Sequence, residues 1–194
     1  ALVGDLIIPD TVTSISAYAF KDCQGLTSVT IPNGITSIGQ CTFQDCLNLT
    51  HITIPDSVTE IERWAFVGCS GFISITIPNG VTSIGYSAFE GCRKLTNIIL
   101  PNSITSIESY IFKDCKSLTN ITIPNKVTII SSDAFENCVG LTQISIPSSV
   151  TKIDTGAFKN CSKLKQISIP NSVTKIGQNV FYYCTGLTNI TLGT

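Results

Sequence analysis

The chain has 194 residues, a formal net charge of −1 and 13% charged residues. Because this balance provides no basic surface, it excludes a protein that binds nucleic acid through its net charge. The apolar runs are all shorter than the roughly 18 residues of a membrane-spanning helix. No signal peptide is visible, and neither a CxxC pair nor a histidine partner supports a metal site, so we expect no cofactor.

A constant step of 23 residues runs through the sequence. Eight of the nine phenylalanines follow it from Phe20 to Phe181, and eight of the nine cysteines follow it from Cys23 to Cys184. All eight prolines follow it as well: Pro9, Pro32, Pro55, Pro78, Pro101, Pro124, Pro147 and Pro170. A fixed short period without insertions predicts a solenoid, in which each repeat is one supersecondary unit stacked on the next.

Within each repeat the predicted elements follow in one order, described here for the repeat that starts at Leu118. Leu118–Pro124 alternates apolar and polar residues over its second half, which predicts a strand with one buried face that the proline ends. Asn125 supplies turn chemistry, and Val127–Ile130 predicts a second short extended segment. Ala134–Phe135 then anchors a tight 3₁₀ or irregular return. No stretch has the roughly 10–12 residues of amphipathic pattern that a helix requires.

Both ends of the sequence fall in predicted strands, Val3–Ile8 and Leu187–Leu192. We therefore expect a single solenoid domain over residues 1–194, with eight complete periods and a closing strand. Neither end carries a distinct polar cap, and the chain starts within a repeat and lacks methionine, so we expect an excerpt from a longer array. The alternative is head-to-tail association, which the acids of residues 1–62 and the lysines after residue 155 would favour.

The cysteine column has two interpretations. Coils about 4.8 Å apart bring equivalent Cα atoms within the range that a disulfide accepts. However, eight parallel side chains would have to pair off alternately, so we expect a buried ladder of reduced thiols that pack as small apolar groups. Cys41 lies outside the column, in a variable position shared with Tyr18 and Trp64, and we expect it to be an exposed single thiol.

Catalysis has little support in the sequence. The only histidine, His51, shares a polar strand position with Ser28 and Asp5. Asp5 lies two coils away from His51, about 10 Å at strand spacing, whereas a base and its orienting group need about 2.6–3.2 Å. We therefore expect that the protein is not an enzyme.

Threonine occupies one column in every repeat, from Thr13 to Thr174. Such an array can suggest an ice-binding face, but threonine also suits strand geometry in general. We expect the structural role.

The polar residues of the strand face form the candidate binding surface. Its first column consists of hydrogen-bonding residues: Ser28, His51, Ser74, Asn97, Asn120, Gln143, Gln166 and Asn189. A second column, mostly threonine and serine, runs from Thr30 to Thr191. We expect a shallow concave surface that binds an extended protein partner, the alternative being a solvated face that only keeps the sheet soluble. Because this face lacks Trp, Tyr and Arg, which dominate protein interfaces, we expect weak or multivalent binding, or a binding site elsewhere in the full protein.

A competing surface lies on the returning segments, where the larger side chains gather. These are Tyr18, Arg63, Trp64, Tyr86, Tyr110, Tyr182 and Tyr183.

The motifs IPNSVTKIG at Ile169–Gly177 and AFENCVGLTQISIP at Ala134–Pro147 resemble the BspA-like, or TpLRR-type, leucine-rich repeat, and the resemblance covers essentially the whole chain. It implies an α/β-type, right-handed leucine-rich-repeat solenoid, made mostly of short β-strands and turns, with a parallel β-sheet on its concave side. It also implies a cell-surface or secreted protein that binds host or partner proteins.

Two functions follow as hypotheses. The first is a non-enzymatic protein-interaction or adhesion module that uses the concave strand face. The second is a structural segment that self-associates end to end into filaments.

Overall fold

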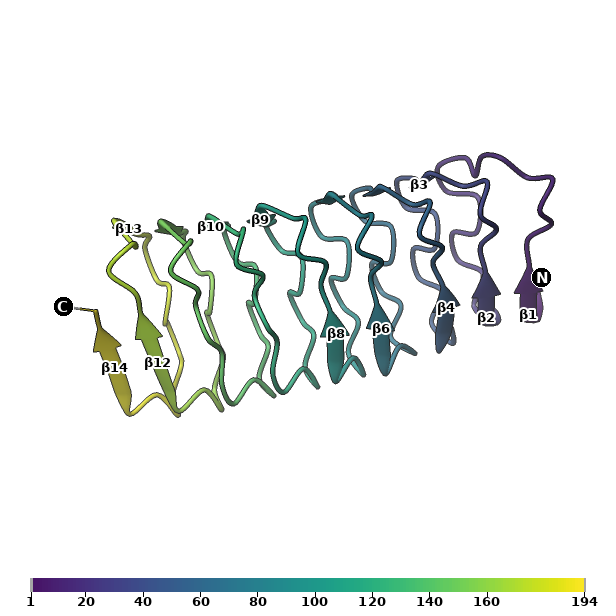
Figure 1. Ribbon diagram of the computed structural model, residues 1–194. Coiled ribbons are helices and arrows are strands. Elements are labelled where there is room, and N and C mark those ends of the chain that lie inside the picture. The colour runs from purple at the N-terminus through teal and green to yellow at the C-terminus, as the bar shows by residue number, and fades with distance from the viewer. Residues whose placement is uncertain (1, 194) are drawn as a thin grey trace.

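The computed structural model describes residues 2–193, and the outermost residues of the expected domain, Ala1 and Thr194, lie outside the described residues. The chain winds into a stack of about eight coils of similar shape, with the two termini at opposite ends of an elongated molecule (Figure 1). This is the stacked arrangement that the constant step predicts.

The first row of strands runs along one side of the stack (Figure 1). It consists of β1 (Val3–Ile7), β2 (Gly25–Thr30), β4 (His51–Thr53), β6 (Ser74–Thr76), β8 (Asn97–Ile99), β12 (Gln166–Ile169) and β14 (Asn189–Leu192). Within this row β1, β2 and β4 form one parallel sheet, β6 and β8 a second, and β12 and β14 a third, and the strands pair at the offset of one repeat, as in Gln166 opposite Asn189. The offset changes only near the start, where the register shifts between Gly4 and Asp5.

A second row of two-residue strands follows the proline turns. It consists of β3 (Ser37–Ile38), β5 (Glu60–Ile61), β7 (Ser83–Ile84), β9 (Ser106–Ile107), β10 (Ile129–Ile130), β11 (Lys152–Ile153) and β13 (Lys175–Ile176). Their second residue is isoleucine in every case, and it is fully or nearly fully buried from β3 to β11. The predicted second extended segment, bracketed by Val127 and Ile130, is therefore confirmed by β10.

The expected strand at Leu118–Pro124 is reduced to a single bridge between Thr122 and Ser145. Burial still alternates there, with Ile121 and Ile123 buried and Asn120 and Thr122 exposed. The side chains of this coil therefore keep the alternating burial of a strand, although its strand pairing with the neighbouring coil consists of this bridge alone.

The segment that leads from the second row back to the first is built from turns. Its successive backbone N–H groups donate alternately to the next coil and to a residue of the same coil. The Phe43 N–H donates to Ala65 O of the next coil at 2.9 Å, whereas the Gln44 N–H donates back to Cys41 O at 3.2 Å. An α-helix needs successive donors to bond four residues back, and no helix forms over residues 2–193. The α/β label therefore fits only in part, because the chain is a solenoid of parallel strands joined by turns. In the same described range, no helix has the length and apolarity needed to cross a membrane.

This alternation depends on two left-handed backbone positions in every coil, which the sequence analysis did not predict. The first column has φ between 54° and 65°: Tyr18, Cys41, Trp64, Ser87, Tyr110, Asp133, Gly156 and Asn179. The second has φ between 55° and 74°: Asp22, Asp45, Gly68, Gly91, Asp114, Asn137, Asn160 and Tyr183. Asp, Asn and Gly tolerate positive φ best, so their recurrence in the second column is the signal that could have revealed it.

The core is a continuous apolar cluster that runs through the stack. Its centre is a ladder of phenylalanine rings from Phe20 to Phe181, with neighbouring centroids 5.3–6.0 Å apart and planes within 23° of each other. Stacked rings at this distance attract one another beyond the effect of their burial. Since each inner ring contacts one ring on either side, the ladder joins each coil to both neighbours.

The cysteine column lies beside this ladder. Seven thiols, from Cys46 to Cys184, each donate to the carbonyl of the phenylalanine 26 residues earlier, at 3.0–3.4 Å. Burial raises the pKa of the Cys46 thiol to about 12 and also raises the pKa of Cys115 well above its ordinary value. The thiols thus pack as neutral, weakly donating groups, and their reduced state stays a prediction.

The expectation of an exposed thiol at Cys41 is wrong, because only 4% of this residue is exposed. Its N–H donates to Arg63 O at 3.3 Å, which holds the corner of the coil against the next one. A small side chain at this corner is covered by its neighbours, whereas Tyr18 at the same position is large enough to stay 50% exposed.

The threonine column is used within the protein. The Thr82 hydroxyl and the Thr82 N–H both donate to Thr59 O of the preceding coil, at 3.2 Å and 2.9 Å. Thr128 and Thr151 repeat this arrangement. These hydroxyls reinforce the contact between coils, which supports the structural role.

Candidate functional site

The eight predicted residues of the first polar column lie in one row along the strand face. Seven are exposed, and the eighth, Ser28, is half-buried. Asn120 shows the alternation that points these side chains outward, since it is exposed beside the buried Ile121.

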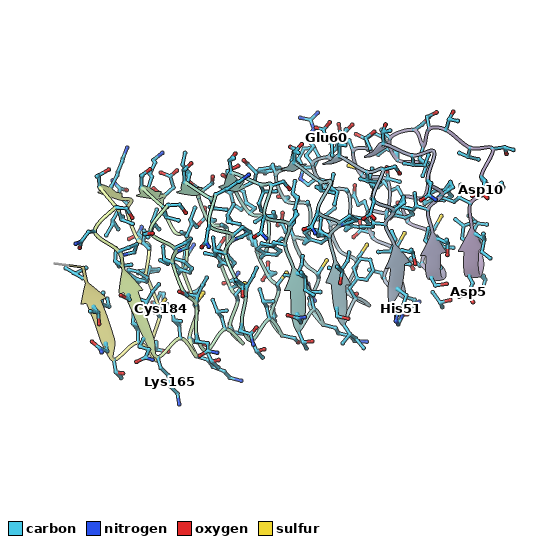
Figure 2. All side chains as sticks on the ribbon, in the orientation of Figure 1. Asp5, Asp10, His51, Glu60, Lys165 and Cys184 are labelled. Atoms are coloured by element: carbon cyan, nitrogen blue, oxygen red, sulfur yellow. The ribbon has the colours of Figure 1, made fainter. Side chains whose placement is uncertain are left out.

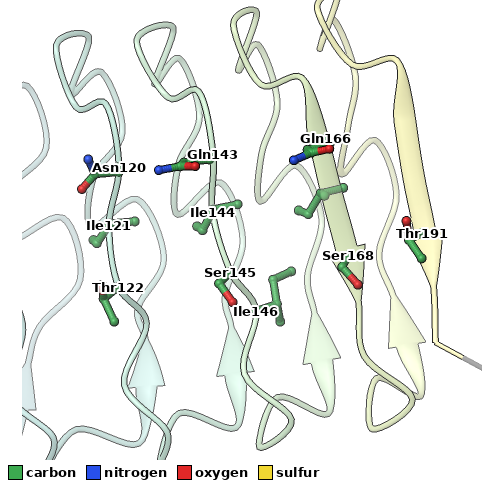
Figure 3. A pocket seen from close by; sticks show the side chains of 11 residues that line it. Asn120, Ile121, Thr122, Gln143, Ile144, Ser145, Ile146, Gln166, Ser168 and Thr191 are labelled. Carbon is green, nitrogen blue, oxygen red and sulfur yellow. The ribbon is translucent and has the colours of Figure 1, made fainter.

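Part of this face is hollowed. A depression of about 790 Å³ lies over the coils between Asn120 and Thr191 (Figure 3). Its lining consists of Asn120, Ile121, Thr122, Gln143, Ile144, Ser145, Ile146, Gln166, Ile167, Ser168 and Thr191. The hollow therefore lies on the strand face, and the use of this face for binding stays a prediction.

The structure brings only three of the eight predicted residues into this hollow, namely Asn120, Gln143 and Gln166 (Figure 3). The second polar column contributes four more groups, among them Ser145 and Ser168. Side-chain amides and hydroxyls both donate and accept hydrogen bonds. The lining therefore offers two rows of neutral groups that match the donors and acceptors of an extended backbone.

The other end of the same face carries Asp5, Ser28 and His51 (Figure 2 labels Asp5 and His51). The Asp5 carboxylate accepts hydrogen bonds from Ser28 Oγ at 2.7 Å and Thr27 Oγ1 at 3.0 Å, and these bonds lower the pKa of Asp5. His51 Nδ1 lies 3.3 Å from Thr50 Oγ1. Asp5 thus engages the neighbouring coil rather than the histidine, so the row has the residue types of a catalytic triad without its geometry. Residues 2–193 contain no group of three or more His, Cys, Asp or Glu that could hold a metal ion.

The return side holds a buried charge cluster that the sequence analysis missed. Glu136, only 8% exposed, accepts hydrogen bonds from Lys113 at 3.0 Å and Lys159 at 2.8 Å, one on the coil before it and one on the coil after it. Burial opposes ionisation of Glu136, but the two lysines prevail and lower its pKa. This cluster connects three coils, and the alternating charges at the repeat offset are the signal that could have revealed it.

The predicted competing surface separates into two parts. Tyr182 and Tyr183 contact each other with ring centroids 4.3 Å apart, three coils beyond Tyr110. The remaining members form a continuous row in which Gln40, absent from the prediction, connects Tyr18 to Arg63. Gln40 occupies the position of Arg63 one repeat earlier, so the period itself marks it.

Comparison with known proteins places this geometry in a family. The family model of the BspA type leucine rich repeat region matches residues 3–118 and 82–194 of the chain, in six copies. No curated protein matches the chain.

Solved structures of bacterial leucine-rich-repeat proteins have the same fold. A protein from Bacteroides ovatus is 29% identical with a TM-score of 0.69, and the match covers 98% of this chain and 63% of that one. The leucine rich repeat protein of T. pallidum is 27% identical with a TM-score of 0.75, over 95% of this chain and 78% of that one. A leucine rich cell surface protein from Faecalibacterium prausnitzii is 31% identical with a TM-score of 0.52, over 95% of this chain and 64% of that one. The chain thus spans less than two thirds of the length of the Bacteroides and Faecalibacterium proteins.

Proposed function

Because this chain belongs to the BspA-type leucine-rich-repeat family, we propose that it is a non-enzymatic protein-interaction or adhesion module that binds an extended polypeptide on its strand face. The hollow between Asn120 and Thr191 carries this proposal. Its two rows of neutral donors and acceptors extend over three and four coils, the longer row over about 15 Å at strand spacing. That length accommodates about four or five residues of extended chain.

A position at the cell surface, or secretion, is part of the same proposal. It is supported by the similarity to the protein from Faecalibacterium prausnitzii, which is named a leucine rich cell surface protein. The partner is accordingly a protein of the host or of another cell surface.

The composition of the hollow defines how binding depends on salt. Its lining contains no charged residue, so binding is insensitive to ionic strength between about 0.05 and 0.5 M salt. Since no Trp, Tyr or Arg lies in it, a single peptide binds weakly and several copies bind together.

The test uses random peptides displayed in many copies on phage and selected on the immobilised protein. Asn120→Arg and Gln143→Arg insert long charged side chains into the hollow, and we expect each to reduce binding of the selected peptides at least tenfold. The matched control is Asn125→Arg, which makes the same kind of change at an exposed turn position of the same coil. Equal binding by Asn120→Arg, Gln143→Arg and the wild type would exclude the strand face as the binding surface.

We further propose that residues 1–194 act as one solenoid domain, since the apolar cluster is continuous from Ile8 to Cys184. A second candidate function is head-to-tail self-association. It is favoured by the uneven charge of the chain, since residues 1–62 hold seven acids and one base, whereas the residues after 155 hold four lysines and no acid. Light scattering distinguishes the two functions. If the protein forms rods at low salt and added salt suppresses their growth, the result supports self-association. If the protein is a monomer at all salt concentrations, the result supports the binding module.

A further inference from the structure

A continuous row of large side chains crosses five coils outside the strand face. Tyr18 Oη accepts a hydrogen bond from Gln40 Nε2 at 2.7 Å, and Gln40 Oε1 accepts two from Arg63, at 3.1 Å and 3.0 Å. The row then continues through Trp64 and Tyr86 to Tyr110, with successive ring centroids 5.4 Å apart. We call these six residues, Tyr18, Gln40, Arg63, Trp64, Tyr86 and Tyr110, the aromatic row.

The aromatic row is partly open to solvent. Tyr18 is 50% and Tyr86 is 39% exposed, and Arg63 is exposed as well, whereas Gln40, Trp64 and Tyr110 are half-buried. Tyr, Trp and Arg are the residues that contribute most of the binding free energy at protein interfaces. The strand face lacks all three, so the row is a second surface, independent of the one proposed above.

The backbone gives no reason for aromatic residues at this corner. Tyr18, Trp64 and Tyr110 all adopt positive φ, which bulky side chains rarely do. Other coils have Gly156 or Asn179 at the same position, residues that adopt this conformation with little strain. Three aromatic residues therefore stand where the fold favours small ones, and unfavourable conformations of this kind concentrate at binding sites.

The charges of the row indicate the chemistry of the partner. The Arg63 guanidinium lies 5.1 Å from the centre of the Trp64 ring and donates only to the neutral amide of Gln40. No ion pair involves Arg63 among residues 2–193. Since a guanidinium has five donors in a planar fork suited to a carboxylate, an acidic side chain of a partner would complete its bonding.

The ring orientations indicate a polypeptide rather than a sugar. The Trp64 and Tyr86 planes are 83° apart, and those of Tyr86 and Tyr110 are 75° apart. Edge-to-face rings do not form the flat platform on which a sugar ring stacks. Their faces and edges instead offer apolar area that single side chains of a polypeptide can contact.

We propose that the aromatic row binds a protein segment that sets a carboxylate against Arg63 and a neighbouring proline or apolar side chain against Trp64 and Tyr86. The row thus gives the protein a second, charge-selective binding surface beside the neutral strand face.

The chain contains one tryptophan, Trp64, and so its fluorescence reports directly on this row. The probes are synthetic nonapeptides without tryptophan that carry a central Glu flanked by Pro, Leu or Phe, together with the same peptides carrying a central Lys. We expect the Glu peptides to shift the Trp64 emission with saturation, and the Lys peptides to bind at least tenfold more weakly. Added salt weakens the binding, because it screens the carboxylate.

Two variants test the residues. Arg63→Gln removes the charge. Tyr86→Ser removes the aromatic ring, and the backbone accommodates serine at this position, because Ser109 and Ser132 occupy it in the next two coils. We expect each to weaken the Glu peptides at least tenfold, with the far-UV circular dichroism and melting curve unchanged in shape. Arg93→Gln, at the only other arginine and also exposed, is the matched control and retains wild-type affinity.

Three results would overturn the proposal. The first is an emission spectrum that no Glu peptide changes at millimolar concentration. The second is equal affinity of Arg63→Gln and wild type for the Glu peptides. The third is saturable binding of neutral oligosaccharides, such as maltohexaose, by this row in place of the peptides.

Discussion

At the scale of single residues, the fold depends on two backbone conformations in each coil that most residues avoid. Asn137 shows how the second of these columns is stabilised. Its φ is 61°, its amide donates to Asp114 Oδ1 at 3.2 Å, and its Oδ1 accepts a hydrogen bond from Asn160 at 2.7 Å. The side chain thus tolerates the left-handed backbone and also connects three coils.

Replacing Asn137 separates these two contributions. We expect Asn137→Ala to lower the free energy of unfolding by about 2–3 kcal/mol, through lost hydrogen bonds and left-handed strain. Asn137→Gly loses the same bonds without the strain, so it should be about 1 kcal/mol more stable than the alanine variant. Urea denaturation measures both, and equal midpoints for Ala and Gly would show that this position is unstrained.

At the scale of elements, the cysteine column makes the stability of the protein depend on alkaline pH. Burial raises the pKa values of Cys46, Cys69, Cys92, Cys115 and Cys138 in the folded state. Above pH 9.0, their ordinary value, the unfolded chain loses these protons while the folded chain keeps them. The unfolded state then binds fewer protons, and so stability falls as pH rises.

Each such thiol lowers the free energy of unfolding by about 1.4 kcal/mol per pH unit once the unfolded thiol is ionised. We therefore expect reversible unfolding above about pH 9 in the presence of a reductant. Cys92→Ala removes one such group and should reduce the slope of stability against pH by about that amount. Melting temperatures recorded from pH 7 to 11 provide the measurement, and a flat profile would contradict a column of buried neutral thiols.

The sequence predicted those elements whose causes are local. Alternation and the proline step predicted the first strand, the turn and the second extended segment at Ile129–Ile130. The sequence did not predict the two columns of left-handed backbone, because hydrogen bonds between coils determine that conformation. The Tyr18 N–H, for example, donates to Gln40 O of the next coil. For the candidate site, the period predicted which side chains share a row. It could not predict that a hollow lies over the coils from Asn120 to Thr191, because the stacking of coils determines that shape.

At the scale of the whole molecule, stability comes from contacts between neighbours rather than from any one centre. The phenylalanine ladder is the clearest case, since the centroid of the Phe112 ring lies 6.0 Å from that of Phe89 and 5.5 Å from that of Phe135. In such an array, cooperative unfolding requires that the interface between each pair of neighbouring coils be stable enough for the coils to fold together.

Phe112→Ala should therefore do more than destabilise the protein by about 3–5 kcal/mol. We expect it to uncouple the two halves, so that urea denaturation followed by Trp64 fluorescence no longer coincides with that followed by circular dichroism. The control is Phe72→Leu, which places the leucine common at this position of other coils and should cost less than about 1.5 kcal/mol with coincident transitions. Coincident transitions in Phe112→Ala as well would show that the array unfolds as one unit without this ring.

The constant step of 23 residues also has a mechanical consequence. In the stack, a coil occupies about 5 Å of the long axis. When tension on the two ends detaches one coil, its 23 residues can extend to about 76–83 Å. Each coil that tension detaches would therefore lengthen the protein by many times the distance that the coil occupies in the stack.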